Sequence, residues 1–94
     1  MTIYLAGKIS GDPGYREKFE AAAARLRESL DVGVINPATL PAGMSNADYM
    51  AICLPMLLRA DLAVFLPDWR DSPGAYLEHA LCLYVGKPVM VLEE

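Results

Sequence analysis

Residues 61–81 read DLAVFLPDWRDSPGAYLEHAL and join a strand, a turn and a helix in one stretch. The continuous apolar run at 61–66 is typical of a strand buried in a parallel sheet. Ser72 followed by Pro73 predicts the N-cap and first residue of a helix, and Gly86 predicts its end. A strand that turns directly into a helix is the repeating unit of α/β folds.

The rest of the chain repeats this alternation. An apolar run at residues 2–6 predicts a first strand, and Asp12-Pro13 predicts the N-cap and start of an amphipathic helix. Further strands are expected at residues 32–35 and 89–92. The order of elements predicts one domain over the whole chain, with a three-layer α/β architecture, a parallel sheet of four to five strands and helices on both faces.

Two predictions concern the later helices. Ser45 and Asp48 form a capping box for a helix that ends near Arg59, and Pro55 is expected to kink or divide it. In the last helix the predicted core residues are Leu77, Ala80, Leu81 and Tyr84, whereas the apolar Tyr76, Cys82 and Leu83 lie off this stripe. Those off-stripe residues suggest that the helix also contacts a second subunit, which makes a homo-oligomer, a dimer or larger, the expected state.

Composition narrows the function classes. The chain has 94 residues, 54% of them apolar, and a formal net charge of -4, which argues against binding to a nucleic acid polymer. Cys53 and Cys82 are too few for a zinc site or a disulfide framework and suit a reducing compartment. No apolar run reaches the roughly 18 residues of a membrane span, and no leader precedes the first strand. We therefore expect a cytoplasmic protein with no metal, cofactor or membrane partner.

Two loops are the expected ligand-binding region. In parallel α/β sheets ligands bind at the carboxyl ends of the strands, where residues 7–14 and 67–74 lie. Both loops lead into helix N-termini, which attract anions, and Ser72 and Lys8 would add a hydroxyl and a charge. Ser72 serves equally well as an ordinary N-cap. The glycine spacing matches neither the dinucleotide pattern nor the P-loop.

Glu78 is the sharper signal. From Gly74 to Tyr84 the helix contains only two polar residues, Glu78 and His79, and small residues precede Glu78 by one turn. A carboxylate in such surroundings is partly desolvated, which raises its pKa. The alternative is that Glu78 belongs to a solvent-facing stripe of the helix. This alternative is weakened because the next residue on that stripe is Cys82 rather than lysine or arginine. His79 has no partner at ligand spacing and fits a solvent or interface role.

Three residues of the turn before this helix have open roles. Trp69 is suited either to stacking on a ring-shaped ligand or to covering the core. Asp68 and Asp71 place carboxylates at the same edge of the sheet, but charged turn residues are usually only solvated.

Several segments resemble the DUF4406 family, a group related to nucleoside 2-deoxyribosyltransferases. They are IYLAG at 3–7, Asn36-Pro37, Ala60-Asp61, the pattern LPxWxxSxGAxxE at 66–78, and Gly86-Lys87-Pro88. The resemblance spans nearly the whole chain and implies a flavodoxin-like sheet, an oligomer whose active sites are completed by a neighbouring subunit, and N-glycosidic chemistry.

The resemblance assigns roles to individual residues. Glu78 matches the glutamate that attacks the anomeric carbon of the sugar, and Ser72 matches a serine that holds a 5′-phosphate in nucleotide hydrolases. Tyr4 and the first loop match the residues that frame the base and phosphate. The substrate-binding set implied in this way is Tyr4, Gly7, Lys8, Ser10, Gly11, Trp69, Ser72 and Gly74.

The chain departs from the family's relatives in two places. The relatives carry an aspartate about eight residues before the one at position 61, where this chain has Cys53. Their Gly-Trp-Glu reads Asp68-Trp69-Arg70, which leaves Asp68 or Asp71 as the candidate proton donor. The expected function is an N-glycosidic hydrolase or deoxyribosyl transferase acting on a nucleoside 5′-monophosphate. The alternatives are a non-catalytic nucleotide-binding module and an oligomeric interaction module.

Overall fold

The computed structural model, which describes residues 1–93, is a three-layer α/β structure. Its elements are β1 (Thr2–Ala6), α1 (Tyr15–Ser29), β2 (Gly33–Ile35), α2 (Asn46–Arg59), β3 (Leu62–Phe65), α3 (Pro73–Val85) and β4 (Val89–Val91), with short 3₁₀ turns η1 (Pro37–Thr39) and η2 (Trp69–Asp71). The four strands of the described chain are parallel in the order β2-β1-β3-β4. The predicted α/β class and parallel sheet are confirmed, and the layering is that of flavodoxin-like and Rossmann-like folds.

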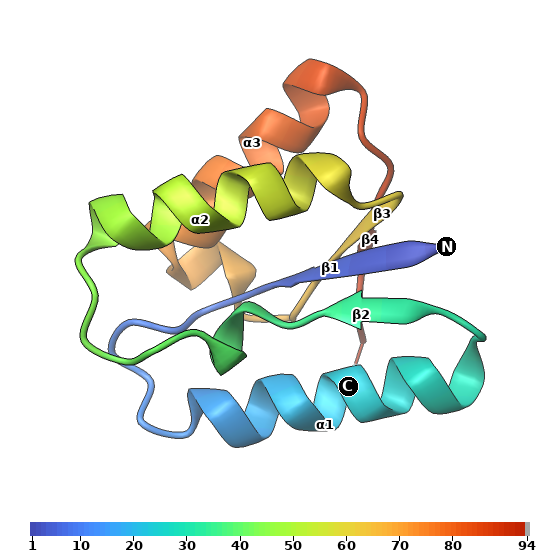
Figure 1. Cartoon of the computed structure of the whole chain (residues 1–94), viewed down its shortest axis with the longest axis horizontal. Helices are drawn as coiled ribbons and strands as arrows, with labels where there is room; N and C mark the ends of the chain where they lie inside the picture. The colour runs from blue at the N-terminus through green and yellow to red at the C-terminus, as the bar shows by residue number, and fades with distance from the viewer. Residues whose placement is uncertain (94) are drawn as a thin grey trace.

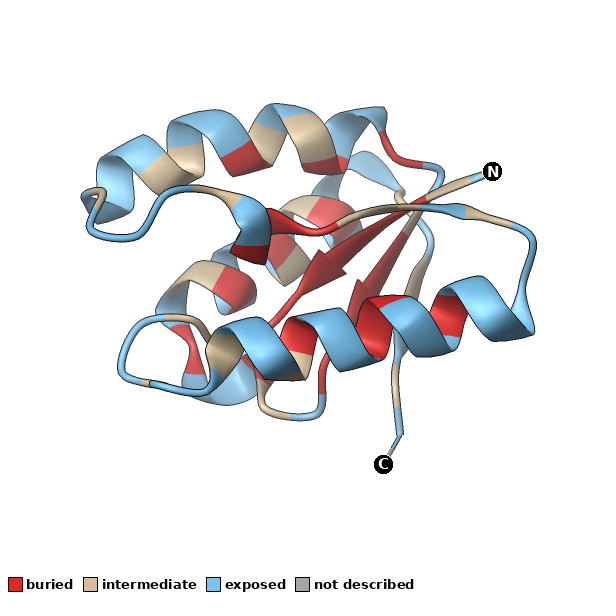
Figure 2. Cartoon of the chain, turned by 60° about the horizontal axis from the view of Figure 1, so that its bottom comes forward, coloured by how far each residue is buried: buried red, intermediate tan, exposed pale blue. Residues whose placement is uncertain are grey.

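The helices cover both faces of the sheet. Figure 1 shows α1 on one side of the strands and α2 with α3 on the other. Successive side chains of a strand point to opposite faces, so Ile3 and Leu5 of β1 pack toward α1, whereas Tyr4 and Ala6 pack toward α2 and α3. In Figure 2 the buried positions of α1 face the strands and its exposed positions face away.

Local capping signals placed most helix ends correctly. The hydroxyl of Ser45 accepts a hydrogen bond from the N–H of Asp48, and Gly86 ends α3 with a left-handed φ of 76°. Pro55 lies inside α2 without dividing it. The predicted N-cap of α1 is wrong, because Gly14 holds that position and the Asp12 carboxylate instead accepts the Gly14 N–H at 3.0 Å. Helix α1 therefore begins at Tyr15.

The predicted core face of α3 is wrong except at Leu81, which is half-buried and packs against the core, and Ala80 is exposed. Leu77 and Tyr84 are 61% and 90% exposed, whereas Ala75, Glu78 and Cys82 are the buried residues of this helix. The buried stripe consists of two small side chains and a carboxylate, so the small residues let α3 approach the sheet and the bulky ones face outward. Cys82, which the sequence suggested for a subunit contact, is fully buried against the sheet.

The helices of the described chain are too short, or too polar, to cross a lipid bilayer.

Candidate functional site

A cavity of about 270 Å³ opens beside the carboxyl end of β1. It is enclosed by the first loop, the N-terminal half of α2 and the first turns of α3. Its lining residues are Tyr4, Ala6, Gly7, Ile9, Ser10, Phe19, Pro37, Asn46, Tyr49, Met50, Cys53, Ser72, Pro73, Gly74, Ala75, Leu77 and Glu78. The cavity therefore lies at the edge of the sheet where the sequence predicted ligand binding.

Glu78 and Tyr4 form the polar contact of this cavity. The Tyr4 hydroxyl donates a hydrogen bond of 2.5 Å to Oε2 of Glu78, and the two residues are 1% and 5% exposed. Tyr4 reaches the carboxylate because the alternation of β1 directs it toward α3. A buried carboxylate therefore borders the cavity with a fixed donor on one oxygen.

Burial controls the protonation of this pair. Desolvation raises the pKa of Glu78 from its ordinary 4.5 to about 7, and the hydrogen bond from Tyr4 opposes the rise. Desolvation, followed by the nearby Glu78 charge, raises the pKa of Tyr4 far above its usual range. Glu78 therefore exchanges its proton near neutral pH, whereas Tyr4 keeps its proton.

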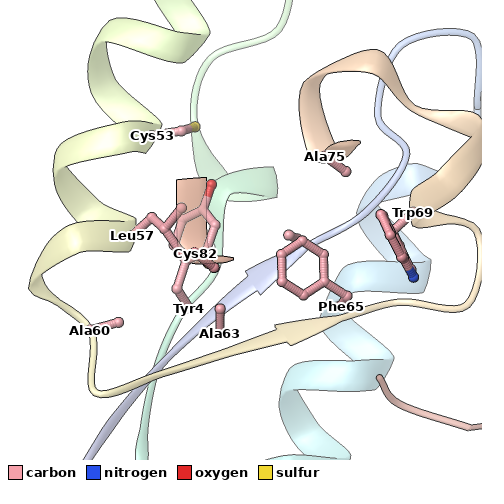
Figure 3. Packing of buried hydrophobic residues seen from close by; sticks show 10 residues of the cluster. Tyr4, Cys53, Leu57, Ala60, Ala63, Phe65, Trp69, Ala75 and Cys82 are labelled. Atoms are coloured by element: carbon pink, nitrogen blue, oxygen red, sulfur yellow. The ribbon is translucent and has the colours of Figure 1, made fainter. Parts of the chain in front are cut away.

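Two thiols border the carboxylate. Cys53 of α2 lines the cavity at 4% exposure, and Cys82 lies fully buried one turn after Glu78. Figure 3 shows the Tyr4 hydroxyl directed toward the side of α2 that carries Cys53. Burial raises the pKa of both thiols; the Tyr4 hydroxyl opposes the rise at Cys53, and the Glu78 charge adds to the rise at both. Both thiols therefore remain protonated and neutral.

The start of α3 forms one wall of the cavity. The Ser72 hydroxyl accepts a hydrogen bond from the N–H of Ala75 at 3.2 Å. Ser72 is therefore the N-cap of α3, as the sequence predicted. A side chain at Gly74 would approach the Cε atom of Met50 within 3.3 Å, so this position favours a small residue. The helix N-terminus thus borders the cavity through Ser72 and Gly74.

The first loop contributes Gly7 and Ser10. A Cβ atom on Gly7 would lie 2.8 Å from Cδ1 of Leu66, so glycine is required for the loop to pass the end of β3. Ser10 is an exposed residue at the border of the cavity.

The remaining predicted site residues lie outside the cavity lining. These are Lys8, Gly11, Asp68, Trp69 and Asp71. Asp68 accepts hydrogen bonds from Nζ of Lys18 at 2.5 Å and from the backbone N–H of Lys8 at 3.1 Å. The structure therefore places Asp68 in a clamp between the first loop and η2, away from Glu78. Asp71 is exposed at the end of η2.

Trp69 is part of the core. Its ring is 6% exposed and stacks on the His79 ring with centroids 4.1 Å apart, while Phe65 meets it edge-on at 5.5 Å. The sequence left two roles open for Trp69, and the structure shows that it covers the core. His79, expected at a solvent or interface position, is the half-buried partner in this stack.

Apart from Cys53, which the resemblance placed where the relatives carry an aspartate, the sequence analysis missed the cavity wall that α2 provides. Asn46, Tyr49, Met50 and Cys53 all line the cavity from this helix. They recur at the spacing of one helical face, so this periodicity was the signal that could have found them. Tyr49 is held by its hydroxyl, which donates to the carbonyl of Pro41 at 2.7 Å.

The arrangement suits carboxylate chemistry at an organic ligand. The ionised form of Glu78 can attack or stabilise an electron-poor carbon, and its protonated form can donate a proton. Within residues 1–93 no cluster of three histidine, cysteine or carboxylate side chains is placed to hold a metal ion.

The sequence matches, over residues 1–91, the family described as "Domain of unknown function (DUF4406)", and the chain belongs to this family. Neither the curated proteins nor the solved structures include a match.

Proposed function

We propose that this member of the DUF4406 family cleaves the N-glycosidic bond of a nucleoside 5′-monophosphate, with Glu78 as the nucleophile. The observation that carries the proposal is the Glu78–Tyr4 hydrogen bond at the wall of a cavity large enough for a small organic ligand. The resemblance of the third-strand-to-helix segment to nucleoside 2-deoxyribosyltransferases supports the same chemistry. This proposal gives Glu78 a role that its burial alone leaves unexplained.

The reaction follows from the chemistry of the pair. The Glu78 carboxylate attacks the anomeric carbon as the bond to the base breaks, which yields a glycosyl ester and the free base. Water then attacks the ester in a hydrolase, or a second base attacks it in a transferase. Tyr4 holds one carboxylate oxygen and leaves the other to react. Its hydrogen bond also stabilises the ionised form that the attack requires.

The sugar phosphate is assigned to the start of α3. Ser72 and Gly74 place a hydroxyl and the N-terminus of a helix on the cavity wall, and helix N-termini attract anions. The half-buried side chains of Tyr49 and Met50 offer aromatic and apolar surface for a planar base.

Base release from mixed nucleosides and nucleoside monophosphates, in ribo and deoxyribo forms, tests the proposal. We expect chromatography to detect free base, and monophosphates to react faster than nucleosides. Glu78→Gln should reduce the rate by at least about 10³-fold, in the range seen when a nucleophile is removed. Glu17→Gln makes the same change at an exposed position of α1 and should leave the rate unchanged.

The absence of base release above the level of Glu78→Gln would refute the proposal, provided that the variant and the unmodified chain unfold cooperatively. A loss of activity in Glu17→Gln would show that the assay responds to general damage rather than to the site.

A second candidate is a non-catalytic nucleotide-binding module. The observation in its favour is Cys53, a neutral thiol on the cavity wall where the resemblance implies an aspartate. This candidate predicts that nucleotides raise the melting temperature of the unmodified chain and of Glu78→Gln alike, without any base release. A melting temperature that no nucleotide changes would remove it.

We further propose that the outer face of α3 joins copies of the chain into a homo-oligomer. This face exposes four large apolar side chains, Tyr76 at 56%, Leu77 at 61%, Leu83 at 66% and Tyr84 at 90%. Contiguous exposed apolar surface is typical of interaction sites. An oligomeric interaction role without catalysis would use the same face.

Light scattering coupled to gel filtration tests the oligomer. We expect a mass of at least two chains, and Leu83→Glu should shift it toward one chain because the charge would be buried at the interface. Ala24→Glu, at an exposed position of α1, is the matched control. A monomeric mass for the unmodified chain would contradict the proposal.

A further inference from the structure

The cavity wall holds one ionisable group that titrates near neutral pH. Within the described chain, Glu78 is the only residue of the cavity lining that can carry a charge near neutral pH. No lysine, arginine, aspartate or histidine of residues 1–93 borders the cavity. Asp68 is held by Lys18 outside the cavity lining, and Asp71 is exposed at the end of η2. Glycoside cleavage usually employs two carboxyls, one of which protonates the leaving group. Here the cavity lining of a single chain provides the nucleophile alone.

The hydroxyls and thiols of the wall are poor proton donors. The Tyr4 hydroxyl is already committed to Glu78, and burial raises its pKa far above neutrality. The Tyr49 hydroxyl is committed to the carbonyl of Pro41. Cys53 has a raised pKa for the same reason as Tyr4. A base that must gain a proton as it departs would find no suitable acid among these groups.

The lining residues also make the cavity favourable for a positively charged ligand. A single buried carboxylate in an otherwise uncharged wall attracts a cation, because the low local dielectric weakens its charge less than water would. The half-buried aromatic side chain of Tyr49 on the cavity wall is suited to contact a flat cationic ring.

We propose that the site takes nucleotides whose base is a cationic ring, such as an N7-alkylated purine or a pyridinium, which departs without being protonated. This inference rests on the proposed glycosidase function and names its substrate class.

The proposed reaction balances without an acid. The Glu78 carboxylate forms a bond to the anomeric carbon as the glycosidic bond breaks, and the electron pair of that bond passes to the ring nitrogen. The cationic base thereby leaves neutral. Water then cleaves the glycosyl ester, the sugar gains the hydroxyl, and the remaining proton passes through the Glu78 carboxyl to solvent.

The matched substrates are 7-methylguanosine 5′-monophosphate and guanosine 5′-monophosphate, each in ribo and deoxyribo form. The members of a pair share sugar, phosphate and ring system and differ in the charge of the base. Nicotinamide mononucleotide supplies a second cationic ring. Rates are measured on the full chain in its solution assembly, with Glu78→Gln subtracted as background for each substrate.

We expect kcat/KM to be at least about 10²-fold higher for the 7-methylated substrate, the lower bound of what general acid catalysis supplies to a neutral base. Equal values for the two members of a pair would overturn the inference and leave the glycosidase proposal standing. Release of base from neither member, nor from nicotinamide mononucleotide, would overturn both.

Discussion

The two faces of the sheet are packed with different kinds of side chains. Toward α1, the strands present Ile3, Leu5, Val64 and Leu66, which meet the apolar stripe of that helix in a buried cluster. Toward α2 and α3, the strands present Tyr4, Ala6, Ala63 and Phe65, and the two helices contribute Leu57, small residues, two thiols and Glu78. The first face supplies apolar packing. On the second face, a buried carboxylate lies beside the cavity at a position that an apolar side chain could otherwise fill.

The difference shows how a chain of 94 residues divides its core between stability and a site. Desolvating a carboxylate opposes folding when the group is charged, and small residues bury less apolar area than leucine or isoleucine. Both costs fall on the α2 and α3 face. In the described chain, the buried residues of the α1 face include neither a carboxylate nor a thiol, and four predictions test this difference between the faces in decreasing order of effect.

The largest effect is expected from truncating the α1 face. Leu5→Ala removes a fully buried side chain of the central strand β1 and should lower the free energy of unfolding by about 2–5 kcal/mol. Cys82→Ala, equally buried on the opposite face, removes one heavy atom and should cost about 1 kcal/mol. Urea unfolding measures both. Equal losses would contradict the asymmetry.

The next effect is a pH dependence of stability that belongs to Glu78. Its folded pKa of about 7 exceeds its ordinary 4.5, so the folded state holds the proton more tightly than the unfolded chain. The contribution of Glu78 to the free energy of unfolding is therefore full below pH 4.5, falls as the pH rises, and is lost above pH 7. With about 1.4 kcal/mol for each pKa unit, the loss is roughly 3 kcal/mol.

Unfolding curves at a series of pH values, for the unmodified chain and for Glu78→Gln, measure this contribution. We expect the glutamine variant to lack the decline because its amide does not titrate. An identical decline in both proteins would assign it to other groups.

A smaller effect is expected from Tyr4→Phe. The Tyr4 hydrogen bond lowers the pKa of Glu78, so its removal should move that pKa above about 7. At pH 8, where the carboxylate is largely ionised, the loss of stability should be about 1.5–3 kcal/mol, and it should be smaller at pH 5. NMR titration of the glutamate side-chain carboxyls measures the pKa. A lowered pKa in the variant would contradict the role given to Tyr4.

The smallest effect concerns the clamp outside the cavity. Lys18 binds Asp12 and Asp68 at 2.5 Å each, with its side chain 28% exposed, so Lys18→Met should cost about 1 kcal/mol. Arg27→Met breaks a more exposed pair with Glu20 and should cost nearly nothing. Part of the Lys18 contribution should disappear in 1 M salt. Equal unfolding midpoints for the two variants would show that the clamp adds no stability.

Much of the site could be predicted from the sequence, because several signals are local. Glu78 was identified as an unusual polar residue in an apolar helix, and Ser72 and Gly74 as the helix start. Residues such as Asp68 and Trp69 were assigned to the ligand because they lie in the right loop. Their side chains are instead drawn away by Lys18 and by the His79 ring, partners that no local pattern reveals.

The sequence by itself determined the order of strands and helices and their ends at Ser45, Ser72 and Gly86, because capping and β-propensity depend on neighbouring residues. Only the tertiary structure decided which face of α3 is buried. Both faces of that helix are apolar, so the choice depended on how closely the small residues Ala75 and Cys82 let it approach the sheet. That choice turned Glu78 inward to meet Tyr4, 74 positions away in the chain.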